Sequence, residues 1–144
     1  AEGDYPDHLK AHAFQDMAFA VEANAIAREA TDGPAVRAEV RSFLERSLAI
    51  IPGNKTALTK MGVLHQYLDP AQALDYLEQA YRLPQEEPEA EYWLAKLLIE
   101  SPTKSLQDPT RAQAILENWL LSHPKDHPKA PEFAALLATL RAPQ

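Results

Sequence analysis

Residues 55–87 read KTALTKMGVLHQYLDPAQALDYLEQAYRLPQEE, and this stretch decides the fold. Asp69-Pro70 divides it into two apolar halves. Asp at a helix N-cap followed by Pro at the first helical position favours a helix start, because the N–H that Pro lacks has no partner there in any helix. Pro84, which follows the second apolar run, indicates a helix end. The stretch therefore predicts two consecutive helices joined by a tight turn.

The second of these helices recurs in the chain. Its central run, Leu77-Glu78-Gln79-Ala80-Tyr81, has counterparts that begin 33 residues earlier at Leu44 and 39 residues later at Leu116. Each copy is followed by a proline, namely Pro52, Pro84 and Pro124. Upstream, Asp69, Pro70 and Ala73 are repeated as Asp108, Pro109 and Ala112. A period close to 34 residues is typical of arrays in which two-helix units stack on one another.

The rest of the chain follows the same pattern. Its 12 prolines fall between apolar stretches, and no segment alternates apolar and polar residues long enough to predict a strand. We predict an all-α protein of seven helices, at about 6–30, 35–50, 55–68, 70–83, 88–100, 109–122 and 131–141. Residues 1–144 would form a single domain with units at about 6–54, 55–87 and 88–124. The last helix, with apolar residues at spacings of three and four, is expected to cap the stack.

The unit at 55–87 resembles a tetratricopeptide repeat. Leu58, Met61, Gly62, Ala73, Leu77, Ala80 and Pro84 occupy that family's small and large positions, whereas His65 replaces its usual aromatic residue. The unit at 88–124 has Ala95 in place of the glycine and Trp119 in place of the second small alanine. Its long loop, 101–107, also makes it similar to a Sel1-like repeat. The resemblance implies a right-handed superhelical stack of antiparallel helix hairpins, a tetratricopeptide-like solenoid in which Gly62, Ala73 and Ala80 allow close helix packing.

The resemblance also implies where a partner would bind. By register with the family, the concave face is lined by the first helix of each unit and includes Thr59, Val63, Gln66, Tyr67, Tyr92, Lys96 and Ile99. This mixed polar and aromatic surface suits a partner peptide or helix. Thr59 and Val63 stand where chaperone-binding relatives carry polar clamp groups, which disfavours that partner. The implied function is a non-catalytic protein-protein interaction scaffold.

Two alternatives remain open. The middle unit is also similar to the repeat domains of bacterial cytochrome c maturation accessory proteins, which recruit apocytochrome tails. The other alternative is an assembly module. Helix 6–30 carries two apolar stripes, so one of them is available to a homo-oligomer partner. The stripes are Phe14, Met17, Ala18, Val21 and Ala25, and Phe19, Ala23 and Ile26.

Composition limits the remaining classes. A net charge of −7 disfavours nucleic-acid binding, because affinity for phosphate backbones comes from Lys and Arg. The absence of Cys excludes a disulfide framework and a thiolate site. No stretch approaches the roughly 18 apolar residues of a membrane span. The start at Ala1 slightly favours a periplasmic or exported protein over a cytoplasmic one.

No catalytic motif is present in the sequence, so we expect no enzyme, cofactor or metal. His8, His12 and Asp16 share one predicted helix face, but a solvated face is favoured over a metal site. His65 is interpreted as a core residue that hydrogen-bonds a neighbouring helix. Two further groups have structural explanations: His123 and His127 in a surface loop, and Glu86, Glu87, Glu89 and Glu91 at a helix N-terminus, where negative charge is favourable.

Overall fold

The computed structural model describes residues 6–27, 33–84 and 88–141. These residues form seven α-helices and one short 3₁₀ helix, with no strand among them, so the predicted all-α class is confirmed. Residues 28–30 of the predicted first helix lie outside the described residues. The helices are α1 (Asp7–Ala27), α2 (Gly33–Ile50), α3 (Lys55–His65), α4 (Pro70–Arg82), α5 (Pro88–Glu100), η1 (Lys104–Leu106), α6 (Pro109–Ser122) and α7 (Ala130–Arg141).

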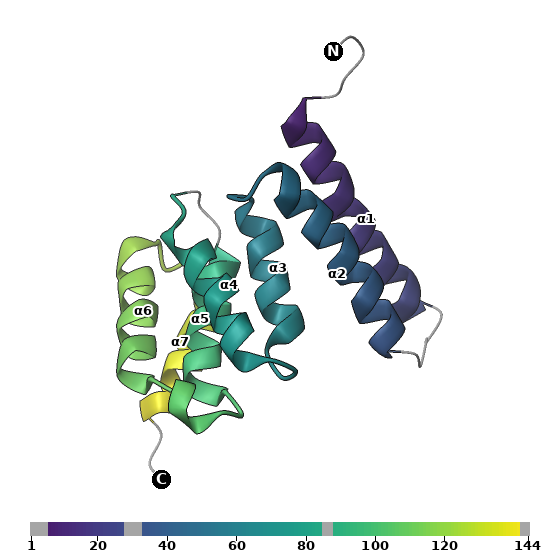
Figure 1. The fold of residues 1–144 in the computed structure, drawn as a ribbon. Helices are drawn as coiled ribbons and strands as arrows, with labels where there is room; N and C mark the ends of the chain where they lie inside the picture. The colour runs from purple at the N-terminus through teal and green to yellow at the C-terminus, as the bar shows by residue number, and fades with distance from the viewer. Residues whose placement is uncertain (1–5, 28–32, 85–87, 142–144) are drawn as a thin grey trace.

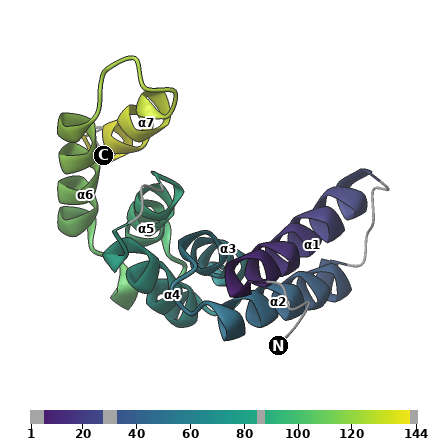
Figure 2. The same ribbon diagram turned by 90° about the horizontal axis from the view of Figure 1, so that it is seen from above.

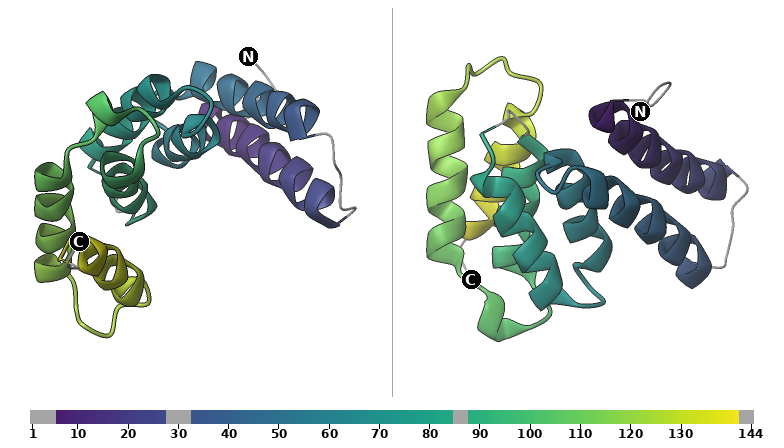
Figure 3. Two further views of the ribbon diagram at one scale, coloured as in Figure 1. Left: turned by 90° about the horizontal axis from the view of Figure 1, so that it is seen from below. Right: turned by 45° about the horizontal axis from the view of Figure 1, so that its top comes forward.

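Consecutive helices pair as antiparallel hairpins, α1 with α2, α3 with α4 and α5 with α6 (Figure 1). The hairpins follow one another along an arc, with α1, α3, α5 and α7 on its inner side and α2, α4 and α6 on its outer side (Figures 2 and 3). Contacts between α3 and α5 and between α5 and α7 agree with this inner row. The inner side is therefore made by the first helix of each predicted unit.

Two Asp-Pro pairs start helices, as predicted. Asp69 and Asp108 have the same backbone angles, φ −147° and ψ 78°, and each is followed by a proline in the first turn of α4 or α6. Asp69 accepts a hydrogen bond from the backbone N–H of Gln72 at 3.2 Å, and Asp108 accepts one from Arg111 at 3.1 Å. These caps supply partners for N–H groups that the helix leaves unpaired.

The end of α3 differs from the prediction. This helix was expected to reach residue 68 but ends at His65. A turn follows, in which the N–H of Asp69 bonds the carbonyl of His65 at 2.8 Å. The chain leaves the helix early because Asp69 must adopt the extended backbone of an N-cap for α4.

A glycine brings α3 and α4 together. A Cβ added to Gly62 would lie 2.6 Å from Cδ2 of Leu77 and closer still to its Cγ. Ala73 and Leu77 of α4 are almost fully buried. The expected role of Gly62 in close helix packing is therefore confirmed.

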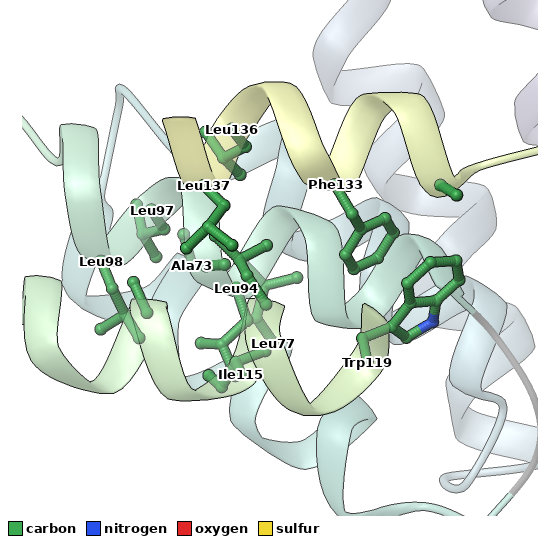
Figure 4. Packing of buried hydrophobic residues seen from close by; sticks show 14 residues of the cluster. Ala73, Leu77, Leu94, Leu97, Leu98, Ile115, Trp119, Phe133, Leu136 and Leu137 are labelled. Atoms are coloured by element: carbon green, nitrogen blue, oxygen red, sulfur yellow. The ribbon is translucent and has the colours of Figure 1, made fainter. Parts of the chain in front are cut away.

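The C-terminal core joins α4, α5, α6 and α7 (Figure 4). Trp119 of α6 stacks on Phe133 of α7, with ring centroids 3.8 Å apart and an interplanar angle of 11°. Phe133, Leu136 and Leu137 form the buried face of α7. The large ring of Trp119, at a position where the family has a small residue, thus packs directly against the last helix.

A polar network ties the first hairpin to α3. Asn54 caps α3 by accepting a hydrogen bond from the N–H of Ala57 at 3.2 Å. Its amide nitrogen donates to Oε1 of Gln15 at 3.1 Å and to Oγ of Ser47 at 3.0 Å. Ser47, which is fully buried, donates in turn to the carbonyl of Ala11 at 2.7 Å. One side chain therefore connects α1, α2 and α3.

Two charged contacts join the later helices. Lys55 of α3 is only 5% exposed, and its ammonium donates to the carbonyl of Leu83 at 3.3 Å and lies 3.8 Å from Glu91 of α5. Arg111 of α6 forms a two-pronged ion pair with Glu78 of α4, with Nη2 to Oε2 at 2.9 Å. Such two-pronged pairs fix geometry as well as adding energy.

Candidate interaction groove on the inner face

A cavity of about 280 Å³ opens on the inner side where α1, α3 and α5 meet. Its α3 wall consists of four residues spaced by three and four positions, so one face of that helix forms the floor. The residues that lie 33 positions after Thr56 and Lys60 are Glu89 and Trp93 of α5, which line the opposite wall. The lining residues are Phe19, Thr56, Thr59, Lys60, Val63, Glu89 and Trp93.

Two aromatic rings of the cavity each carry a lysine. The ammonium of Lys60 lies 5.8 Å from the ring centroid of Phe19, and that of Lys96 lies 5.1 Å from the ring centroid of Trp93. Cations within about 6 Å of a ring face are attracted by its quadrupole. The two lysines therefore help to hold the rings in place along the groove.

The charges at the rim are balanced within the chain. Lys60 pairs with Glu22 at 2.5 Å, and Lys96 lies 3.9 Å from Glu100. Because both ammonium groups already face a carboxylate, the groove offers no strong preference for a charged partner. Its selectivity would come from the apolar surface between the rings.

The indole of Trp93 is fixed by a chain of hydrogen bonds. Its Nε1–H donates to Oε2 of Glu89 at 3.2 Å, and Oε1 of Glu89 accepts from Lys129 of the segment before α7 at 2.9 Å. This hydrogen bond to Glu89 is the main cause that raises the pKa of Lys129. A ring that is held before binding loses less freedom when a partner docks.

Two of the predicted groove residues, Thr59 and Val63, line this cavity. Thr59 is 5% exposed, and its hydroxyl donates to the carbonyl of Lys55 at 2.8 Å. The hydroxyl is thus engaged within α3. With the half-buried Val63, the floor of the cavity is mainly apolar.

Three further predicted residues meet at a different place. Gln66, Tyr67 and Lys96 surround a hollow of about 10 Å³ between the C-terminal parts of α3 and α5. That space holds about one water molecule at most. Tyr67 itself is 68% exposed and lies at the surface after α3.

The last two predicted residues, Tyr92 and Ile99, pack against the C-terminal core. The ring of Tyr92 meets that of Phe133 edge-on, with centroids 5.7 Å apart. Their packing places them beside α7, which lies next to α5 in the inner row. The structure therefore does not bring these two side chains into the cavity lined by Thr59 and Val63.

Sequence reasoning missed Phe19, Lys60 and Trp93 as groove residues. The repeat offset contains a usable signal, because Trp93 lies 33 positions after Lys60. The family register placed the groove one turn further along α5. Phe19 gave no such signal, since its place depends on how α1 packs beside α3.

The interpretation of His65 as a core residue is confirmed, since it is 7% exposed. Its expected hydrogen bond to a neighbouring helix is wrong, because Nδ1 bonds the carbonyl of Met61 in its own helix at 2.8 Å. The ring instead contacts Tyr76 of α4, with centroids 5.6 Å apart.

The other candidate groups also have places in the fold. His8, His12 and Asp16 are exposed on α1. His123 and His127 are half-buried against Trp119, with centroids at 4.0 and 5.0 Å. Within the described ranges, no group of three or more His, Asp or Glu side chains could hold a metal ion. Glu89 and Glu91 lie in the first turn of α5, whereas Glu86 and Glu87 lie outside the described residues.

Among the described helices, none is long and apolar enough to cross a membrane. Comparison with known proteins gives no match: no family model fits the chain, and no curated protein or solved structure is significantly similar to it. The functional argument therefore depends on the helix arrangement and on the groove.

Proposed function

We propose that the chain is a non-catalytic interaction scaffold of the tetratricopeptide-like type, a right-handed superhelical stack of hairpins that holds a partner peptide on its inner face. One observation carries this proposal: the inner-face cavity is built by α1, α3 and α5 together. Stacked repeats bind their partners on such continuous surfaces. The repeated Asp-Pro caps and the close approach at Gly62 support the repeat arrangement.

The cavity suits one apolar anchor of the partner. Its volume of about 280 Å³ lies near the lower end of ligand sites, which suits one or two side chains rather than a large cofactor. Phe19, Val63 and Trp93 offer apolar walls, and the Thr59 hydroxyl is already engaged. Burying one Leu or Phe side chain of a peptide there would contribute about 1.5–3 kcal/mol.

The test is a selection of short peptides from a random display library on the full chain, followed by titration of the purified protein. The chain has two Trp residues, so its two indole N–H signals separate the groove from the core in nitrogen-15 NMR. We expect peptide binding to shift the signal of Trp93 and to leave that of Trp119 in place.

A matched pair of variants completes this test. Val63→Lys places an ammonium against the apolar floor and should weaken peptide binding about tenfold or more, because the charge loses hydration. Leu121→Lys is the control, since Leu121 is 84% exposed at the end of α6. Peptides that bind Val63→Lys as tightly as the parent chain would rule out the groove.

A second candidate is self-assembly through α1. Leu9 and Met17 lie eight residues apart on this helix and are 44% and 46% exposed. Light scattering would test it, with Met17→Glu as the variant. Assembly through α1 requires a concentration-dependent dimer that Met17→Glu abolishes, and a monomer at all concentrations would reject it.

A further inference from the structure

A second, larger cavity of about 500 Å³ lies on the other side of the hairpins, between α2 and the turn that joins α3 to α4. It arises because α2 has 18 residues and α3 has 11, so the N-terminal part of α2 extends past its neighbour. Figure 1 shows α2 diverging from α3 in this region. The volume falls within the range of small-molecule sites.

The charged groups of this cavity leave one cation uncompensated. Glu45 is held by Arg41, with Nε to Oε1 at 2.6 Å. Asp69 is engaged as the N-cap of α4. Arg37, also on the α2 wall, forms no ion pair with any residue in the described parts of the chain. A guanidinium in this position offers a planar donor pair that matches a carboxylate.

His65 supplies the complementary group. Its Nδ1 bonds the Met61 carbonyl, which can only accept, so Nδ1 carries the proton and Nε2 of the neutral ring is an acceptor. Among the described residues, every fully buried side-chain nitrogen or oxygen has a hydrogen-bond partner. Nε2 has none there, so it must be open to solvent. Since His65 is 7% exposed and lines this cavity, that opening is the cavity itself.

We propose that this cavity binds a small organic carboxylate that also carries a hydroxyl or N–H group. Arg37 would bind the carboxylate, and Nε2 of His65 would accept the second hydrogen bond. Leu64 and Leu68 line the space with apolar surface. The site is separate from the inner-face groove and does not depend on the function proposed for it.

The experiment titrates the nitrogen-15-labelled full chain with three probes. 4-Hydroxybenzoate carries both groups, benzoate lacks the hydroxyl, and 4-hydroxybenzamide lacks the charge. We expect saturable shifts of the His65 ring nitrogens with 4-hydroxybenzoate, and binding about tenfold weaker for each of the other probes. Equal affinity for the acid and its amide, or no saturable shift with any probe, would overturn the proposal.

Two arginine variants separate the site from general charge. Arg37→Gln should weaken 4-hydroxybenzoate about tenfold or more. Arg46→Gln is the matched control on α2, because the Arg46 guanidinium lies over the rings of Phe14 and Phe43 instead. Equal loss in both variants would overturn the role of Arg37. A glutamate residue blocked at both ends tests for a partner's side chain, and its binding as tightly as 4-hydroxybenzoate would overturn the assignment to a small molecule.

Discussion

Replacing Asn54 tests how the first hairpin is attached to the rest of the protein. Asn54→Ala removes the N-cap of α3, at a cost of about 1 kcal/mol. It also removes the amide hydrogen bonds to Gln15 and Ser47, which contribute about 1 kcal/mol each. The free energy of unfolding should therefore fall by about 2–3 kcal/mol. Asn54→Asp keeps the cap acceptor and should lose only about 1–2 kcal/mol.

Urea unfolding followed by far-ultraviolet circular dichroism measures both variants. Asn118→Ala is the control, because Asn118 is exposed in the middle of α6, and its effect should stay within about 0.5 kcal/mol. A double-mutant cycle with Ser47→Ala should give a coupling of about 0.5–1 kcal/mol. The reasoning fails if Asn54→Ala behaves like the control, or if the Asp variant is as unstable as the Ala variant.

Three further changes test other contacts. Gly62→Ala should lower the melting temperature, because overpacking against Leu77 costs about 1–3 kcal/mol and exceeds the gain of about 1 kcal/mol in helix propensity; an unchanged or higher value would contradict the close contact. Lys55→Met should lower the free energy of unfolding by about 2 kcal/mol through the lost hydrogen bond to Leu83, and a neutral effect in urea would refute this. Burial raises the pKa of Tyr76 above its ordinary 10.0, so the folded state holds the phenol proton more tightly and stability falls as pH rises past 10.0. Tyr76→Phe should flatten this alkaline decline in unfolding measured at several pH values, and an equal slope in both proteins would contradict it.

The helices could be predicted because their signals are local. Asp69 and Asp108 carry the cap and the proline start within three residues of sequence, and both operate as expected. The end of α3 could not be located in this way. Its last residues are compatible with a helix, and only the demand of the next cap ends it at His65.

The groove was predictable only in part. Thr59 and Val63 follow from the helix register, since they lie on the floor of a single helix. Tyr92 has the corresponding position in α5, yet its ring packs on Phe133. That outcome depends on how α7 docks, which no local pattern specifies. The outer cavity likewise results from the unequal lengths of α2 and α3 rather than from any motif.

The serial arrangement of the hairpins has a consequence for how the protein responds to force. Its more extensive contacts all join helices that are neighbours or next neighbours along the chain. Chains dominated by such local contacts fold rapidly, and repeat arrays can lose one unit while the others persist. Tension applied to the two ends should therefore extend the molecule in successive steps, and each step should correspond to the release of one hairpin.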